Sequence, residues 1–473
     1  MSLGFLAILF GYFLFTLVML RVSFSESPLH TRSLILLLLF AQFCVKIVDR
    51  FYLPAYLSRA GDENDWLRFF ASYEPGGKIP YQASLEGPGI YYLVNLVANL
   101  FRVDYASALT GLAILLGTLY LIPTFIMYRV FFKGDGRLAF AGTLLLSFTD
   151  VMVYSTTIAR PTLFGLFLIP ITVGAFQALR GRFRRSTFIV LVSTSAAILI
   201  MHAPITYVVL LSLVSFTVVI FDRVRKWEAA YTLILFASYG LAVLILPFLD
   251  SLWRAEFLSV SPLNRIAAFL NAGFFLIFPA IGVVVLALSP CLSVAIERIR
   301  GQGNRVFPER SEVTSYVTLC VFSLACIAFC ILTLQKYASF ITVYYGSLEA
   351  FAMLHAWKII FAAIGLIGIK TIGTRYRRIS NDTVFSWSLG VGVVALIGAI
   401  IAVMMHYSGI LNLDERFTEF AYFPAIYFVT VGLKSLAERF SSRTFRWLIL
   451  PLMATYVIPS IIVGTRMLPM FKP

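Results

Sequence analysis

Four consecutive polar residues, Asp62-Glu63-Asn64-Asp65, form the segment of this sequence best suited to chemistry. Three of them carry a carboxylate, and the surrounding residues are rich in tyrosine, tryptophan and phenylalanine. A carboxylate near a membrane surface can act as a general base toward a hydroxyl acceptor, or it can bind a divalent cation such as Mg²⁺ or Mn²⁺. The alternative is a solvated turn that caps a helix, because acidic residues also favour helix N-termini.

Cationic and imidazole side chains at the ends of apolar runs form a second group of candidates. Lys358 follows His355 by one helical turn inside such a run, so the two share a helix face. A charge at this depth costs about 2.5–3.5 kcal/mol to insert, so it either faces the protein interior or a water-filled cavity, or snorkels to the interface. Lys46, near the end of another run, is expected to snorkel and receives no role. The other candidates are Arg160, His202, Lys336, His406, Glu415 and Arg416.

Two of these candidates have simple structural alternatives. Arg416 stands in an acidic segment that we expect to be a loop, where an ion pair with a neighbouring carboxylate would explain it. His202, between Met201 and Pro204, could orient a substrate or cap a broken helix. The residues alone do not decide between these interpretations.

The composition places the candidates in a membrane protein. Of the 473 residues, 60% are hydrophobic and 13% are charged, whereas a soluble chain carries about 25% charged residues. The net charge of +15 does not indicate a nucleic acid partner, because the basic residues lie in short segments between apolar runs. The five cysteines lie inside or near apolar runs, where buried hydrophobic roles are expected rather than a metal site.

Hydropathy predicts an all-α polytopic membrane protein with about 12–14 transmembrane helices, in a single transmembrane domain over residues 1–473. The first run is expected to be a retained helix, since no basic segment precedes it. The tight pairs at 138–179 and 187–221 are expected to be short, broken or re-entrant helices. The predicted spans are 3–22, 33–48, 104–128, 138–155, 160–179, 187–201, 204–221, 229–250, 270–292, 314–334, 350–370, 385–405, 420–436 and 447–465.

Positive charge gathers in every second loop, which the positive-inside rule assigns to the cytoplasm. The surplus charge needs no role beyond orientation and contact with anionic membrane lipids. This topology places both termini outside the plasma membrane and leaves the candidate residues on the non-cytoplasmic face. The basic sets are Arg129/Lys133/Arg137, Arg180/Arg182/Arg184/Arg185, Arg223/Arg225/Lys226, Arg298/Arg300/Arg305/Arg310, Lys370/Arg375/Arg377/Arg378 and Lys434/Arg439/Arg443/Arg446.

One external loop, residues 49–103, is much longer than the others and contains the acidic cluster. Its many aromatic and apolar residues argue for an ordered, functional loop. We expect two interfacial helices in it. One covers Asp62–Phe70, with acidic residues in its first turn, and the other covers Pro88–Arg102, where a proline suits the first turn.

This order of features resembles the GT-C superfamily of membrane glycosyltransferases, in its prokaryotic form. The resemblance rests on the early external loop, on Gly61-Asp62 at its acidic cluster and on Gly87-Pro88-Gly89-Ile90-Tyr91-Tyr92 later in it. It continues more weakly in Arg160-Pro161-Thr162, Met201-His202-Ala203-Pro204 and Asn412-Leu413-Asp414-Glu415-Arg416-Phe417.

The resemblance implies a function and roles for the candidates. A sugar would move from a polyprenyl-phosphate-linked donor to a glycan, lipid or protein acceptor on the non-cytoplasmic face. Asp62 would be the catalytic base, with Asp65 and Glu63 as neighbours able to replace it. The leaving phosphate needs cationic partners, because negative charge develops on it. The candidates for that role are Arg416, Arg160, Lys358 and His355, with His202, His406, Lys336 and Glu415 as further ones.

Departures from the family pattern limit the resemblance. No WWDYG-type motif is present and the chain ends soon after its last span, which argues against an oligosaccharyltransferase acting on asparagine. A second external acidic motif, which metal-dependent members use, is represented only by Asp150. Whether the protein uses a metal stays open at this stage; a divalent ion (Mg²⁺ or Mn²⁺), if it is used, would be held by Asp62 and Asp150.

Three other functions remain open at this stage. A transporter or lipid flippase tends to have two similar halves, and no such repeat is evident. A polysaccharide polymerase or ligase typically places its long loop later in the chain. A structural scaffold would leave the acidic cluster unexplained.

Overall fold

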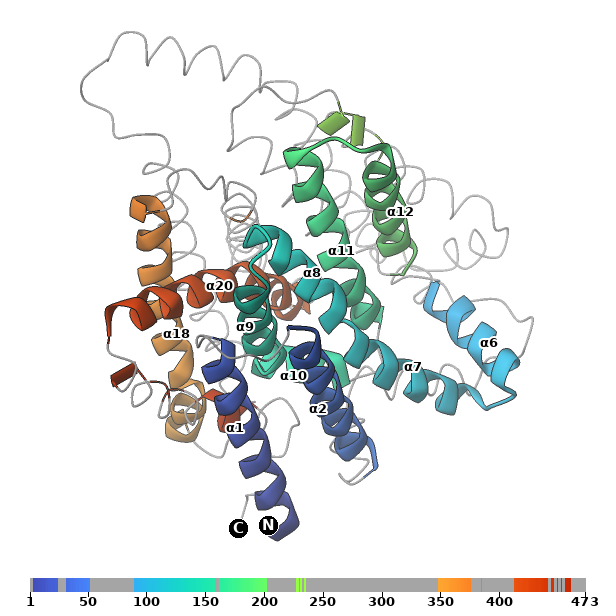
Figure 1. The fold of residues 1–473 in the computed structure, drawn as a ribbon. Helices are drawn as coiled ribbons and strands as arrows, with labels where there is room; N and C mark the ends of the chain where they lie inside the picture. Colours follow the sequence, from blue (N-terminus) through green and yellow to red (C-terminus); the bar gives the residue numbers. More distant parts are fainter. Residues whose placement is uncertain are drawn as a thin grey trace, which may run out of the picture.

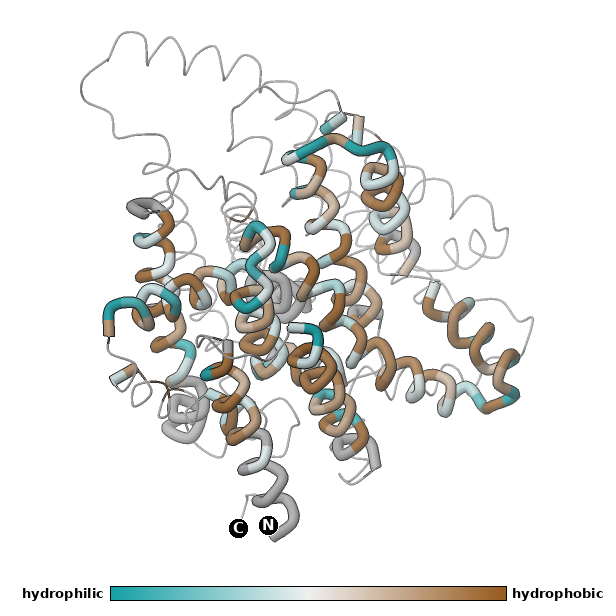
Figure 2. Tube along the Cα trace, in the orientation of Figure 1, coloured by the Kyte–Doolittle hydropathy of each residue, from teal (hydrophilic) through white to brown (hydrophobic). Residues whose placement is uncertain are grey.

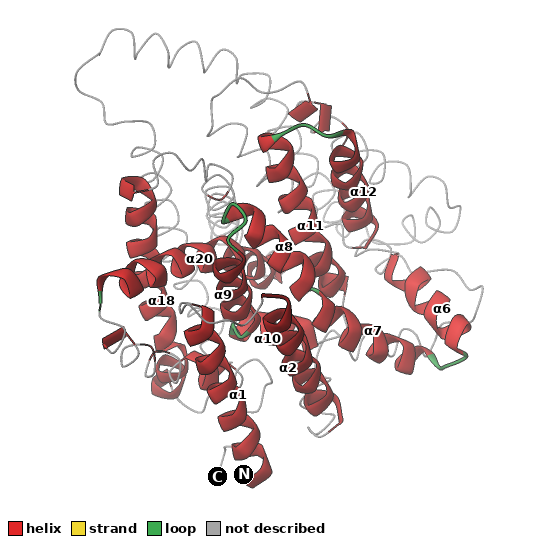
Figure 3. Ribbon diagram, in the orientation of Figure 1, coloured by secondary structure: helices red, strands yellow, loops and turns green. Residues whose placement is uncertain are grey.

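A computed structural model describes residues 3–23, 31–51, 89–157, 161–201, 348–375 and 412–440, with short pieces within 227–234, at 384 and within 444–460. Throughout these residues the elements are α-helices, as predicted, and no strand occurs among them (Figure 3). The predicted spans 204–221, 270–292, 314–334 and 385–405 lie outside this part of the chain, and 229–250 and 447–465 are described at few residues.

Five described helices coincide with predicted spans to within a few residues, because long apolar runs determine them. They are α1 (Leu3–Ser23), α2 (Thr31–Phe51), α11 (Pro161–Gly181), α12 (Arg185–Met201) and α18 (Leu348–Arg375). By length and composition, two stretches of the described residues can cross a membrane, Tyr105–Phe131 and Leu163–Gly181. The prediction of an all-helical membrane fold is confirmed.

The predicted span 104–128 consists of two consecutive helices, α7 (Tyr105–Leu119) and α8 (Leu121–Phe131). Only Tyr120 separates them, and its backbone is itself helical (φ −57°, ψ −21°). Pro123, in the first turn of α8, has no N–H to donate to the preceding turn, which explains an interruption at this point. The chain then turns at Lys133 and Gly134 into α9 (Gly136–Ser147).

Asp104 begins α7 as its N-cap. Its carboxylate accepts hydrogen bonds from the Ser107 hydroxyl (2.6 Å) and the Ser107 backbone N–H (2.8 Å). The hydrogen bond from the Ser107 hydroxyl has the larger effect and the bond from the Ser107 N–H the smaller one. Both favour the charged form and hold the pKa of Asp104 below its usual value. The cap thus stabilises the first turn of a membrane helix at neutral pH.

We expect Asp104→Ala to destabilise the protein at neutral pH, and the deficit to disappear as the solution is acidified. A carboxylate with a lowered folded-state pKa stabilises the fold above its unfolded pKa, and this contribution is lost as the pH falls through the folded-state pKa. Thermal unfolding in detergent between acidic and neutral pH measures the difference. Asp104→Asn is the control, because asparagine also caps helices but does not titrate. A deficit of Asp104→Ala that is independent of pH would contradict the assignment.

The predicted span 138–155 is broken, as its short length suggested. After α9 ends at Ser147, a turn at Phe148 and Thr149 leads into α10 (Asp150–Thr157). Thr149 caps the new helix, since its hydroxyl oxygen accepts the Met152 N–H at 3.3 Å while its own O–H donates to the Leu146 carbonyl at 3.0 Å. Asp150 therefore occupies the first turn of α10, where the helix dipole favours a negative charge.

The helix α20 (Asn412–Arg439) corrects the prediction for Arg416. The expected span began at residue 420 and left Arg416 in a loop, whereas the helix begins at Asn412 and includes both Glu415 and Arg416. Hydropathy marks the membrane-embedded part of a helix and not its polar first turns, so the start was predicted too late. Acidic residues in these turns suit a helix N-terminus. Figure 1 shows α20 crossing α9 and packing along α18.

The second of the two helices predicted in the long loop is present as α6 (Gly89–Phe101), and its interfacial position stays a prediction. The first, Asp62–Phe70, lies outside the described residues. Ile90, Val94 and Ala98 are buried in a cluster with residues of α7 and α11. A second apolar row, which includes Leu96 and Leu100, is exposed. α6 thus has two apolar sides, one against the protein and one available to lipid.

Basic residues gather at one end of the described bundle. Arg129 ends α8 and Lys133 lies in the α8–α9 turn, while Arg182 and Arg184 lie in the α11–α12 turn. The two turns lie toward the same end of the described helices (Figure 1), and both are coloured as polar in Figure 2. α9 leads away from this end over 12 residues, about 18 Å. Asp150 therefore lies well away from the basic turns, and its external position stays a prediction.

Candidate functional site

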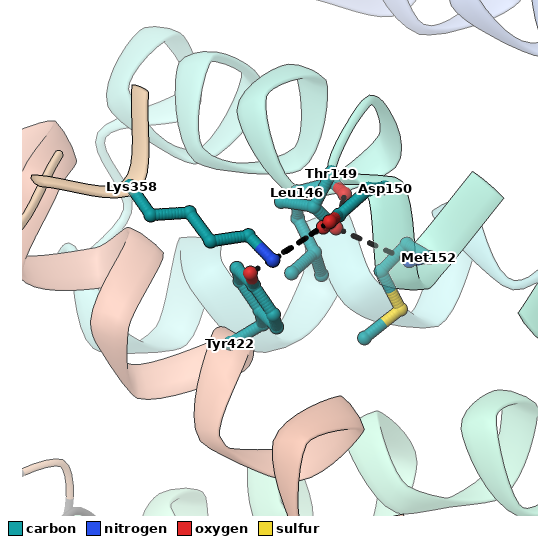
Figure 4. Close-up of polar contacts among 6 residues, drawn as sticks. All are labelled: Leu146, Thr149, Asp150, Met152, Lys358 and Tyr422. Carbon is teal, nitrogen blue, oxygen red and sulfur yellow. Dashed lines mark hydrogen bonds and ion pairs between the residues drawn. The ribbon is translucent and has the colours of Figure 1, made fainter. Parts of the chain in front are cut away.

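The centre of the candidate site is an ion pair between two helices that are far apart in the sequence. The Lys358 Nζ of α18 lies 2.7 Å from the Asp150 Oδ2 of α10 (Figure 4). The Asp150 side chain is 4% exposed and that of Lys358 is 36% exposed. The ion pair therefore joins a buried carboxylate to a lysine whose side chain is partly exposed.

A tyrosine of α20 contacts the same carboxylate. The Tyr422 hydroxyl donates to the Asp150 Oδ1 at 3.4 Å, so the two oxygens of Asp150 face two different donors (Figure 4). Trp357, the residue before Lys358, is buried and packs its ring near those of Tyr422, Phe361 and Tyr456. The Tyr456 hydroxyl in turn donates to the Leu145 carbonyl of α9. Aromatic packing thus fixes α18 and α20 around the ion pair.

A second lysine lies at the other end of α10, and it corrects the expectation that Lys46 snorkels. Lys46 is only 1% exposed, and its ammonium donates to the hydroxyl of Thr156. Gly117 of α7 makes room for this contact, because a Cβ there would collide with the Thr156 carbonyl oxygen. The helix α2 continues to Phe51, five residues beyond Lys46. Lys46 therefore lies within the packed part of the helix and not at its end. Lysines from α2 and α18 therefore hold the two ends of α10.

We expect Thr156→Val to lower the free energy of unfolding by about 1–3 kcal/mol, because a buried ammonium loses an acceptor. The matched control is Thr430→Val. Thr430 is equally buried, and its hydroxyl donates to the Ile426 carbonyl of its own helix. Among the described residues it accepts no hydrogen bond from a lysine, unlike Thr156. Denaturant unfolding in detergent measures both variants. Equal losses would show that the Lys46 contact contributes nothing beyond a local hydroxyl bond.

The structure brings together only part of the predicted site. Lys358 and Asp150, which were singled out separately, form one ion pair. His355 lies in α18, and Glu415 and Arg416 lie in α20, but their side chains are outside the description. The remaining candidates lie outside the described residues altogether: Asp62, Glu63, Asp65, Arg160, His202, Lys336 and His406. Their roles stay predictions.

Tyr422 and the pairing itself were not predicted from the sequence. The available signal was that Lys358 and Asp150 carry opposite charges and were both assigned to the external ends of apolar runs. A charge inside a span is costly unless it is paired, so these two residues were natural partners. For Tyr422, one of 23 tyrosines in the chain, the sequence offered no comparable signal.

The described residues do not fit a divalent metal at Asp150. Mg²⁺ and Mn²⁺ prefer several oxygen ligands. Among the residues that the structure describes, no group of three histidine, cysteine, aspartate or glutamate side chains is close enough to hold an ion. The Asp150 carboxylate instead contacts an ammonium and a phenol.

The described helices and the buried charges are those of an all-helical membrane protein. No protein-family model and no curated protein sequence matches the chain. Among solved structures, it is similar to the oligosaccharyltransferase of Archaeoglobus fulgidus in complex with zinc and sulfate, with a TM-score of 0.51 at 15% identity. This match covers 90% of the chain and 52% of the archaeal protein, so the chain spans about half of that protein's length. The apo form gives a TM-score of 0.48 at 15% identity, covering 91% and 55%.

Proposed function

We propose that this protein is a membrane glycosyltransferase that moves a sugar from a polyprenyl-phosphate-linked donor to an acceptor on the non-cytoplasmic face. The likeness of the fold to a membrane oligosaccharyltransferase over 90% of the chain carries the proposal. It supports membrane glycosyl transfer in general, and the residues of this chain suggest the details. The acceptor, a glycan, a lipid or a protein, is not specified by them.

In the proposed reaction, the Asp62 carboxylate removes the proton from an acceptor hydroxyl. The hydroxyl oxygen attacks the anomeric carbon, the bond from this carbon to the donor phosphate breaks, and the polyprenyl phosphate leaves with the electron pair. The proton remains on Asp62 until solvent removes it. Asp65 and Glu63 are the alternative bases in the same cluster.

Cationic residues would stabilise the leaving phosphate, because its negative charge grows in the transition state. Lys358 supports this proposal best, since its side chain is partly exposed and its ammonium pairs with Asp150. His355 precedes Lys358 by one turn of α18. Arg416 lies about 9 Å along the axis of α20 from Tyr422. The Tyr422 hydroxyl contacts the Asp150 carboxylate, which also pairs with Lys358. Arg160, His202, Lys336, His406 and Glu415 remain further candidates.

A divalent cation enters the proposal through the zinc of the archaeal enzyme. The sequence assigned such an ion to Asp62 and Asp150, where it would neutralise phosphate charge. The ammonium on Asp150 disagrees with that assignment for Asp150.

Transfer from polyprenyl-phosphate sugars in membranes that contain the protein tests the proposed function. We expect Asp62→Asn to lower the rate by about 10²–10⁴-fold, the usual contribution of a general base. Asp104→Asn is the control, because this carboxylate caps α7 next to the same loop and should leave transfer unchanged. Full turnover in the triple variant Asp62→Asn/Glu63→Gln/Asp65→Asn would remove the proposed base. No transfer by the wild type from any such donor would contradict the function itself.

A further inference from the structure

We propose that Lys358 replaces a divalent cation at Asp150, so that the ammonium permanently provides the positive charge that a metal would provide there. The inference deepens the proposed function, because it concerns the charge that faces the donor phosphate. It concerns Asp150 alone, since Asp62 lies outside the described residues.

The Lys358 Nζ lies 2.7 Å from the Asp150 Oδ2, which is the distance of a charge-assisted hydrogen bond. A divalent ion bound to the same oxygen would lie about 2.0–2.6 Å from it. Two cations would then share one carboxylate oxygen at close range, where their mutual repulsion is strong. The second oxygen faces the Tyr422 hydroxyl, a donor that a metal would also have to displace.

Asp150 is 4% exposed, and such a buried carboxylate needs a cation or several hydrogen bonds to remain charged. One ammonium balances one carboxylate, whereas a divalent ion would leave a surplus positive charge until further anionic ligands, from the protein or from phosphate, joined it. Among the described residues no acidic or histidine group gathers with Asp150 to supply them.

Lys358 follows the buried Trp357 in α18, and the Trp357 ring centroid lies 5.5 Å from the ammonium. The side chain of Lys358 is 36% exposed, so it is not enclosed by the protein as Asp150 is. The ammonium can therefore face an incoming phosphate while Asp150 keeps it in place, which is the arrangement that a fixed metal ion achieves in other enzymes.

Binding of Mn²⁺ to the purified full-length protein in detergent tests the inference without a transfer assay. Electron paramagnetic resonance of free Mn²⁺ is compared between the wild type and Asp150→Asn. We expect the two affinities to agree within about twofold, since removing even an outer-shell partner of a metal site costs about 10–100-fold. A loss of about tenfold or more in Asp150→Asn overturns the inference. Asp104→Asn controls for binding to exposed carboxylates.

Anomalous diffraction from wild-type crystals soaked with Mn²⁺ decides the question if Asp150→Asn does not fold. No anomalous peak within bonding distance of the Asp150 carboxylate is expected, and a peak there overturns the inference. Both outcomes are independent of transfer activity. Failure of the proposed function would instead appear as a wild type that transfers no sugar, whatever its response to Mn²⁺.

Discussion

Lys358→Met is expected to lower the free energy of unfolding by about 3–5 kcal/mol, the usual cost of removing one partner of a buried ion pair. The variant leaves the carboxylate of Asp150 in place, and this side chain is 4% exposed and cannot regain its hydration. The Tyr422 hydroxyl, at 3.4 Å, is too distant to compensate for the lost ammonium. Denaturant or thermal unfolding in detergent measures the loss.

The reverse variant, Asp150→Asn, should cost less. Lys358 is 36% exposed and can turn its ammonium toward water, while asparagine remains able to accept from Tyr422. The double variant Lys358→Met/Asp150→Asn should recover much of the loss, because it contains neither charge. Losses that simply add in the double variant would mean that the two side chains do not interact in the folded protein.

The positions of the described helices were predictable from the sequence, but their ends were not. Apolar runs placed α2 and α18 within a few residues, because a long continuous run of apolar residues marks the body of a buried or membrane helix. A broken helix was among the alternatives for this region, but the position of the break was not predicted. It is marked by the capping hydroxyl of Thr149, which hydropathy does not detect. For α20, the polar first turns were assigned to a loop for the same reason.

The site was predictable residue by residue, but not as an arrangement. Burial cost identified Lys358 as a functional candidate, and topology placed Asp150 on the same side. Their contact depends on how α10 packs against α18 and α20, which no local pattern encodes. The prediction that Lys46 snorkels was wrong for a related reason. Its place near a helix end suggested snorkelling, whereas the neighbouring α7 and α10 enclose it through the close approach at Gly117.

Gly368→Ala is expected to be the most damaging small substitution in the described part of the chain, with a loss of about 3 kcal/mol, the upper range for overpacking. A Cβ at Gly368 would collide with the Phe428 carbonyl of α20 and lie 3.0 Å from the Gly432 backbone nitrogen. The contact is reciprocal, because a Cβ at Gly432 would collide with the Ile364 carbonyl of α18. Backbone atoms cannot turn aside as a flexible side chain can, so the two helices would have to separate. Close approach at small residues is a main source of helix association in membranes.

Gly111→Ala is the matched control, because this glycine is also helical but a Cβ there would meet nothing within 4 Å. Alanine at such a position stabilises a helix by up to about 1 kcal/mol. Unfolding of both variants in detergent gives the comparison, and Gly368→Ala should also reduce sugar transfer. α18 carries Lys358 and α20 carries Tyr422, so separating the helices at Gly368 shifts both relative to Asp150. If Gly368→Ala unfolded like Gly111→Ala, the close packing of α18 on α20 would be wrong, and the arrangement of charges that depends on it would be wrong as well.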